Sequence, residues 1–248
     1  MRNKHLGDFA SRDDREWVGN RLADVFAQGT VTFEVYLLQH DGLKVPFLCN
    51  FVALRNGKDE VIGYTGTGRD ISERKAMHEQ MQRMASFDML TELPNRTMLS
   101  ERLQFALMQG RREQCRFAIL FLDLDMFKYI NDKFGHDIGD KLLKQAAGRI
   151  ASHVQPEDTP SRIGGDEFAV LLHTQSEKDA LQIAENIRQS IHRPFEINGL
   201  QLSISASIGI AFFPDHGADE KELLKNADTA MYLAKKKGRN AIAVFSEV

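Results

Sequence analysis

The stretch RIGGDEFAVLL at residues 162–172 carries the strongest structural signal in the sequence. Its two adjacent glycines predict a tight turn with no side chains where a ligand could rest. Asp166 and Glu167 follow at once, and the apolar run after them predicts a strand at 167–173. The stretch therefore predicts a turn that presents two carboxylates at the start of a buried strand.

A second acidic strand end lies in FLDLDMFK at residues 121–128. Side chains alternate along a strand with period two, so Asp123 and Asp125 are expected on the same side. Mg²⁺ usually takes one or two carboxylates plus phosphate oxygens, and Lys128 is placed to meet phosphate charge. An isolated Asp-x-Asp is more commonly a solvated acidic turn. Carboxylates from two strand ends, however, resemble the palm site of nucleotide polymerases.

Separate blocks of sequence, in the right order, resemble the GGDEF family, the diguanylate cyclases. Besides GGDEF at 164–168, these are DMLTELPNR at 88–96, the series DLD, FK, ND, GH and GD at 123–140, and AKKKGRN at 234–240. The resemblance implies an α+β domain with a central, mostly antiparallel sheet flanked by helices. It also implies an enzyme that condenses two GTP molecules into cyclic di-GMP and releases two pyrophosphates.

The resemblance assigns a metal site and a catalytic group. Mg²⁺, with Mn²⁺ as an alternative, is expected at the Asp123 carboxylate, the Leu124 carbonyl and Asp166. Asp166 is also the expected base for the ribose 3′-hydroxyl, because a bound cation keeps it ionised. Glu167 is expected in the same charge cluster, and Lys128 is expected to act with these catalytic residues.

The resemblance further assigns substrate contacts, namely Lys128, Asn131, His136, Asp140, Gly165, Lys235 and Arg239. Asn131 and Asp140 would read guanine, whose edge offers two N–H donors that adenine lacks. Without the resemblance, helix capping would be the preferred explanation of both. Lys128, Lys235 and Arg239 would bind phosphates. His136 would shape the site near the base or ribose.

The reaction predicts a homodimer. Each 3′-hydroxyl must attack the other GTP, so two domains must face each other with two-fold symmetry. A helix at 71–86, with Asp70 able to cap its start, carries Met77, Met81 and Met84 at spacings of four and three. This stripe predicts either a short two-helix seam or packing on a neighbouring domain, and the sequence favours neither.

One family feature is missing. Many members bind their product through an Arg-x-x-Asp motif before the signature, where this chain has Gln155 and Asp158. Losing the guanidinium removes a bidentate phosphate contact. The sequence therefore predicts weak or absent feedback inhibition.

The N-terminal part resembles the second half of a PAS sensor domain. Alternating residues from Val31 to Gly66, with turns at Asp41-Gly42 and Asn56-Gly57, predict an antiparallel meander. We expect a partial PAS module at 1–70, a linking helix at 71–86 and the GGDEF domain at 87–248. Within that domain we expect helices near 96–109, 137–153, 176–192 and 219–237, and strands near 116–123, 167–173, 200–213 and 240–246.

The charge and hydrophobicity of the sequence limit the kinds of partner that we expect for this chain. The net charge of −3 gives no electrostatic case for long nucleic acid or an anionic membrane. No apolar run approaches the roughly 18 residues that span a bilayer, and residues 1–5 lead into no signal-peptide core, so we expect a cytoplasmic chain without membrane contact. Two rival functions are a non-catalytic domain that senses GTP or cyclic di-GMP and a dimerising scaffold. The retained acids, among them Asp123 and Asp166, favour the enzyme.

Overall fold

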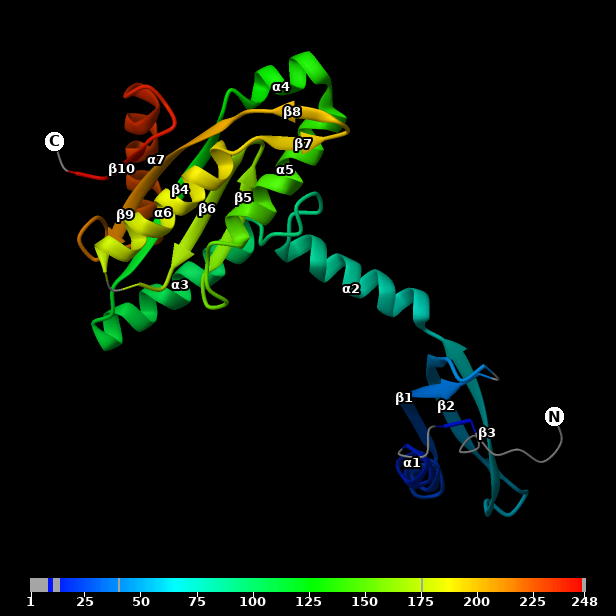
Figure 1. The fold of residues 1–248 in the computed structure, drawn as a ribbon. Coiled ribbons are helices and arrows are strands. Elements are labelled where there is room, and N and C mark those ends of the chain that lie inside the picture. Colours follow the sequence, from blue (N-terminus) through cyan, green and yellow to red (C-terminus); the bar gives the residue numbers. More distant parts are fainter. Residues whose placement is uncertain (1–8, 11–13, 40, 175, 247–248) are drawn as a thin grey trace. The chain divides into compact units, whose positions relative to one another are not determined.

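The computed structural model describes residues 9–10, 14–39, 41–174 and 176–246. The chain divides into two compact units, with the boundary in the sequence between Gln82 and Arg83 (Figure 1). In the described part of the chain, no helix is both long and apolar enough to cross a membrane. The three-part division at 70/71 and 86/87 stays a prediction.

The first unit is the predicted antiparallel meander. Its elements are α1 (Arg15–Gln28), β1 (Thr30–Leu38), β2 (Lys44–Arg55), β3 (Val61–Asp70) and most of α2 (Ser72–Ser86). The strands pair antiparallel in the order β1-β2-β3. Gly66 marks a close approach, because a Cβ there would lie 2.2 Å from the Phe51 ring. Asp70 does accept a hydrogen bond from the start of the helix, since the Ser72 N–H donates to it over 2.8 Å, but it lies one residue before the N-cap position, which Ile71 occupies.

The helix α1 was not predicted, although Val18, Leu22 and Val25 lie at helical spacing and are buried against the meander. In α2 the three methionines of the stripe are each more than half exposed. The stripe is therefore a largely exposed apolar face in this single chain.

The second unit is an α+β domain, as predicted. Its elements are α3 (Arg96–Glu113), β4 (Phe117–Asp125), α4 (Phe127–Phe134), α5 (His136–Ala151), β5 (Thr159–Gly164), β6 (Glu167–Leu172), α6 (Glu177–His192), β7 (Phe195–Ile197), β8 (Leu200–Leu202), β9 (Ser205–Phe213), α7 (Glu220–Lys236) and β10 (Ile242–Val244). The sheet order is β10-β9-β4-β6-β5, and only the β10–β9 pair is parallel.

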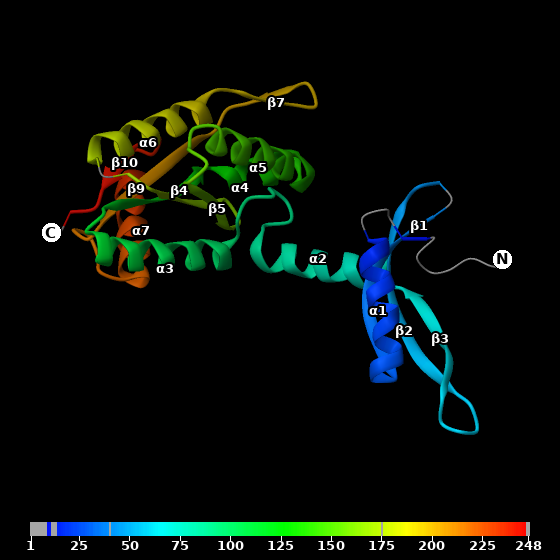
Figure 2. The same ribbon diagram turned by 90° about the horizontal axis from the view of Figure 1, so that it is seen from below.

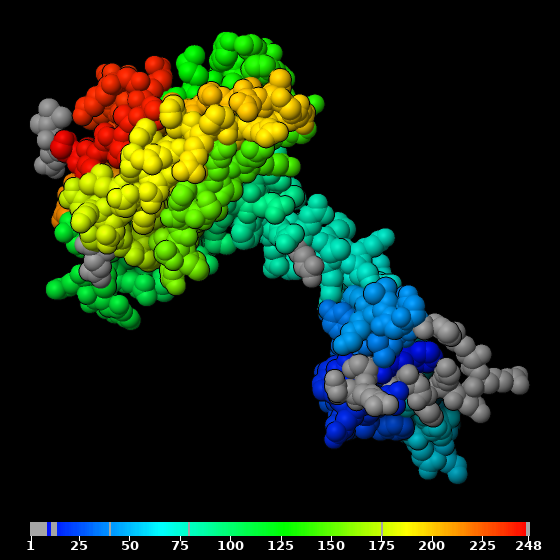
Figure 3. Space-filling model, viewed as in Figure 1, coloured from blue at the N-terminus to red at the C-terminus, as the bar shows by residue number. Residues whose placement is uncertain are grey.

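Helices cover both faces of this sheet (Figure 2). Buried residues of α5 and α6 pack on one face, and those of α3 and α7 pack on the other. In the space-filling view, α6 and the β7–β8 hairpin, coloured yellow to orange, lie over the first face (Figure 3). Every residue of the central strand β4 is buried, so the two acids at its end are held on a rigid element.

Three expectations need correction. The strand expected at 200–213 is divided, because β8 belongs to a separate hairpin and β9 begins at Ser205. The strand β5 was not predicted, because its sequence TPSRIG contains proline and lacks apolar alternation. Such a strand is tolerated at the edge of a sheet. The helix α4 was not predicted either, being only 8 residues long.

Candidate active site

The end of β4 lies beside the β5–β6 turn, as the two acidic strand ends predict. Asp123 pairs with Glu167 across the β4–β6 ladder, and the Leu124 N–H donates to the Asp166 carbonyl over 3.2 Å. The turn consists of Gly165 and Asp166 rather than the two glycines, because Gly164 still pairs with Glu167 in the β5–β6 ladder, after a register shift that leaves Ile163 as the extra residue. Gly165 has a φ of 53°, which glycine adopts without steric cost.

The surroundings of Asp123 raise the pKa of its carboxyl group. Burial raises the pKa of its carboxyl, the Lys235 hydrogen bond opposes this, and the negative charges of Asp166 and Asp125 raise the pKa further. The Lys235 Nζ lies 2.6 Å from the Asp123 Oδ2. The site therefore has an excess of negative charge that one ammonium partly neutralises and that a divalent cation would neutralise better.

Asp125 follows Asp123 on the same strand, but neighbouring groups of the protein already occupy its carboxylate. Its Oδ2 accepts from Ser205 Oγ at 2.7 Å and from the Asn240 N–H at 3.0 Å, and its Oδ1 accepts from Ser207 Oγ at 2.8 Å. Asp125 is 3% exposed. Its oxygens are occupied by neighbours from β9 and the segment before β10, which the local sequence could not reveal.

The donor set suits a hard cation. Among the described residues, no group of three or more His, Cys, Asp and Glu side chains could hold a metal ion. The expected ligands, the carboxylates of Asp123 and Asp166 and the Leu124 carbonyl, would be an all-oxygen set. Mg²⁺ accepts such a set because it keeps water and takes substrate phosphate oxygens for the remaining positions.

The expected guanine residues lie on α4 and α5, which meet at Gly135. The Asn131 Oδ1 is buried and has no hydrogen-bond partner among the described residues. A Cβ at Gly139 would lie 1.9 Å from this oxygen, so the glycine keeps the space that Asn131 occupies. Asp140 and His136 are exposed on α5, and Lys128 is exposed on α4. An unpaired buried carbonyl oxygen is costly unless a ligand N–H completes it.

The segment after α7 has a strained backbone. Gly238, Arg239 and Asn240 all have positive φ, at 116°, 64° and 46°. For a residue with a side chain, this conformation costs about 1–2 kcal/mol unless the surroundings enforce it. Arg239, an expected phosphate ligand, is thus presented from a held turn rather than from a regular element.

A clamp that was not predicted from the sequence holds the catalytic turn. Arg162 Nη1 binds the Asp88 carboxylate at 3.0 and 3.2 Å, and its Nε and Nη2 donate to the Gly165 carbonyl at 3.1 and 2.7 Å. Burial alone would raise the pKa of Asp88, but hydrogen bonds from Thr91 and Arg162 outweigh it, so the pKa is lowered. Both partners stand in or beside blocks that resemble the family, yet no local pattern indicates that they meet.

We expect Asp88→Asn to lower the free energy of unfolding by about 2 kcal/mol at pH 7, because it removes a charge-assisted hydrogen bond from a largely buried pair. Because the pKa of Asp88 is lowered in the folded state, its contribution to the free energy of unfolding is fully present above the unfolded-state pKa of about 3.9. The contribution is lost as the pH falls through the folded-state pKa. Urea unfolding at several pH values measures it. A parent–variant difference that does not shrink in acid would contradict the assignment, and the exposed Asp132→Asn is the control.

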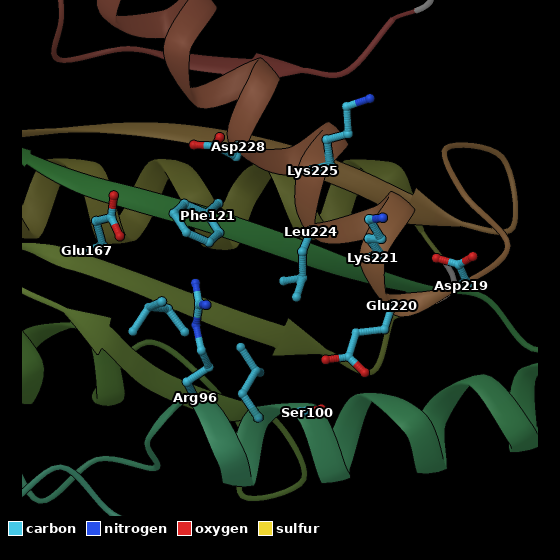
Figure 4. A pocket seen from close by; sticks show the side chains of 12 residues that line it. Arg96, Ser100, Phe121, Glu167, Asp219, Glu220, Lys221, Leu224, Lys225 and Asp228 are labelled. Carbon is cyan, nitrogen blue, oxygen red and sulfur yellow. The ribbon is translucent and has the colours of Figure 1, made fainter.

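Glu167 lines a groove between α3 and α7. The groove has a volume of about 730 Å³. Phe121 of β4 lies on its floor, and Leu224 and several charged residues of α7 line one side (Figure 4). Arg96 extends into it from the start of α3. Glu167 therefore faces this groove as well as adjoining Asp123 across the ladder.

Known proteins are similar to this chain in sequence and in fold. The family model described as "Diguanylate cyclase, GGDEF domain" matches residues 85–241, and a PAS fold model matches residues 1–76. The chain is 45% identical over 168 residues to the bifunctional diguanylate cyclase/cyclic di-GMP phosphodiesterase MucR of Pseudomonas aeruginosa, covering 68% of this chain and 24% of that protein. It is 35% identical over 200 residues to the cyclic di-GMP phosphodiesterase PdeR of Escherichia coli, covering 81% of this chain and 30% of that protein.

Among solved structures, the GGDEF domain of TpbB from Pseudomonas aeruginosa is 42% identical with a TM-score of 0.62, covering 64% of this chain and 99% of that one. The chain spans only about a quarter to a third of the length of the curated relatives named above. The family model nevertheless covers more than half of this chain. The chain therefore belongs to the GGDEF family, the diguanylate cyclases.

Proposed function

We propose that this chain condenses two GTP molecules into cyclic di-GMP and two pyrophosphates, with Mg²⁺, or Mn²⁺ in its place. One observation carries the proposal: a buried strand and a glycine turn bring Asp123 beside Asp166 at one end of the sheet. Such paired carboxylates suit a cation that bridges to a triphosphate. The family membership supports the same reaction.

In the proposed reaction, Asp166 accepts the proton of the ribose 3′-hydroxyl. The O3′ forms a bond to the α-phosphorus of the other GTP, and the bond from that phosphorus to the pyrophosphate oxygen breaks. Mg²⁺ held by Asp123, the Leu124 carbonyl and Asp166 would supply charge stabilisation for this displacement. Lys128, Lys235 and Arg239 bind the phosphates. Lys235, now paired with Asp123, would become available for phosphate when a cation binds that carboxylate.

We infer that the working unit is a homodimer, because one domain holding one GTP cannot supply both reactants. Glu167, His136 and Gly165 would border the reacting groups at the face between the two domains. The exposed methionine stripe of α2 supports this inference as a surface that a second copy could cover. A short helical seam there would set how often the two halves meet.

The guanine assignment predicts the effect of Gly139→Ala. The added methyl group would displace the Asn131 side chain, because its carbon would lie 1.9 Å from the Asn131 Oδ1. We expect the KM for GTP to rise about tenfold or more, with a smaller change in kcat, since a ground-state contact to the base is lost. Initial rates against GTP concentration measure this. Gly148→Ala is the matched control on the same helix, because a Cβ there meets nothing within 4 Å.

Weak feedback inhibition is the second expectation for this activity. Gln155 replaces the family's arginine, and the Asp158 carboxylate already accepts from the Gln155 N–H at 2.9 Å and the His173 N–H at 2.8 Å. We expect initial rates to stay unchanged when micromolar cyclic di-GMP is added. Gln155→Arg should introduce inhibition by restoring a phosphate fork. Strong inhibition of the parent chain would contradict the assignment.

The rival function is a domain that binds GTP or cyclic di-GMP without turnover. The similarity to PdeR, whose name is that of a phosphodiesterase, makes this rival worth testing. The test incubates the purified chain with GTP and Mg²⁺ and separates nucleotides by chromatography, with Asp123→Asn as control. Cyclic di-GMP from the parent alone supports the cyclase. Tight GTP binding without product, even after forced dimerisation through a fused coiled coil, would support the rival.

A further inference from the structure

Asp125 is the centre of a hydrogen-bonded network that the proposed reaction does not use. Its carboxylate accepts two serine hydroxyls from β9 and the backbone N–H of Asn240. A buried carboxylate with three donors is fixed in position, because each oxygen has a directed partner. Asp125 thus ties the end of the catalytic strand β4 to the segment between α7 and β10.

Arg188 holds the same segment through other atoms. Its Nη1 donates to the Asn240 carbonyl at 3.2 Å and to the Asn240 Oδ1 at 2.6 Å. Its Nε and Nη2 donate to the two Glu185 oxygens at 2.8 and 2.7 Å, which orient the guanidinium. Asp125 and Arg188 therefore engage the backbone N–H, the backbone carbonyl and the side-chain oxygen of Asn240.

The segment between these two partners needs to be held. Arg239 and Asn240 are both left-handed, and residues with side chains keep that conformation only where the surroundings enforce it. The Arg239 side chain makes no hydrogen bond or ion pair among the described residues, so the protein controls its position only through the backbone that carries it. Fixing Asn240 fixes the adjoining Arg239 backbone.

We propose that Asp125 and Arg188 form a latch that positions Arg239 for the triphosphate of GTP. Neither residue touches substrate, and the proposal rests on the proposed function, in which Arg239 binds phosphate. Asp125 also lies two residues from Asp123 on β4, so one strand orients the metal carboxylate and the phosphate-binding turn together. The latch thus couples the cation site to the side chain that meets the phosphates.

The experiment measures binding with two probes and no turnover. The first is 3′-deoxy-GTP, which lacks the attacking hydroxyl; the second is GMP, which lacks the terminal phosphates. For Arg188→Met we expect the Kd of 3′-deoxy-GTP with Mg²⁺ to rise about tenfold, because a phosphate ligand is misplaced. The Kd of GMP should stay unchanged. Isothermal titration calorimetry gives both values.

Three further variants separate positioning from folding. Arg149→Met is the matched control, since Arg149 also donates to backbone carbonyls, of Ser190, Arg193 and Pro194, but not at the phosphate turn. It should leave both Kd values unchanged. Asp125→Asn can keep an oxygen at the Oδ2 position, so it should retain 3′-deoxy-GTP binding that Asp125→Ala loses.

The outcomes distinguish failure of the latch from failure of the proposed phosphate-binding role of Arg239. Equal weakening of both probes by Arg188→Met, or no weakening of either, would overturn the latch. Arg239→Ala tests the underlying function separately: if it leaves 3′-deoxy-GTP binding intact, the phosphate role of Arg239 is wrong. If Arg239→Ala weakens binding but Arg188→Met does not, only the latch is wrong. In the Arg239→Ala background, Arg188→Met should have no further effect on 3′-deoxy-GTP binding.

Discussion

Asp166→Asn is expected to lower the rate of cyclic di-GMP formation at least about 1000-fold, because it replaces a carboxylate that is both a proposed metal ligand and the proposed base. The asparagine keeps the size of the side chain and leaves the turn intact, since the turn is held through the Asp166 carbonyl and the Arg162 clamp on Gly165. The loss should therefore appear in kcat without loss of stability. Initial rates and thermal unfolding together measure the two quantities.

The control for this variant is Glu157→Gln, which removes an exposed acid of the same domain outside the site. It should leave the rate unchanged. If Asp166→Asn retained a tenth or more of the parent rate, Asp166 would be neither the base nor a required ligand. A matching drop in melting temperature would instead make the loss a folding effect.

Gly209→Ala is expected to destabilise the GGDEF domain by about 3 kcal/mol or more. A Cβ at Gly209 would lie 2.0 Å from the Ala227 carbonyl oxygen and 2.1 Å from the Met231 nitrogen, which are backbone atoms of α7. Backbone cannot swing aside as a side chain can, so the helix would have to move away from β9. Because α7 also carries Lys235, activity should fall with stability. Urea unfolding followed by circular dichroism measures the change.

The chain supplies an internal control for this measurement. Its single tryptophan, Trp17, lies on α1 in the other unit, so its fluorescence should report an unfolding transition that Gly209→Ala leaves in place. Gly148→Ala, on the open side of α5, should be neutral or stabilising by up to about 1 kcal/mol. A Gly209→Ala domain as stable as the parent would mean that α7 does not cross β9 at this distance.

The sequence predicts those parts of the site whose pattern lies within a short run of neighbouring residues. The apolar run before Asp123 and the glycines before Asp166 each indicate a strand end with an acid, and the structure joins the two ends through β4 and β6. The meander of the first unit was predictable for the same reason, because its strands are neighbours in sequence and alternate clearly.

What could not be predicted depends on residues far apart in the chain. The strand period places Asp125 beside Asp123 but cannot indicate that Ser205, Ser207 and Asn240 occupy its oxygens. Arg188 lies on an amphipathic helix where a charged residue is expected to face solvent, so its contact with Asn240 carries no local signal. Such contacts arise only from the arrangement of the sheet and its helices.

The most direct test of the central claim measures specific activity against enzyme concentration, with cyclic di-GMP and pyrophosphate quantified by chromatography. The proposed condensation of two GTP molecules predicts two pyrophosphates released for each cyclic di-GMP formed, and catalysis between two facing domains makes a second prediction. The specific activity should rise with concentration until the dimer is saturated. If GTP remains unconverted at every concentration, and also when a fused coiled coil enforces the dimer, the chain is not a diguanylate cyclase.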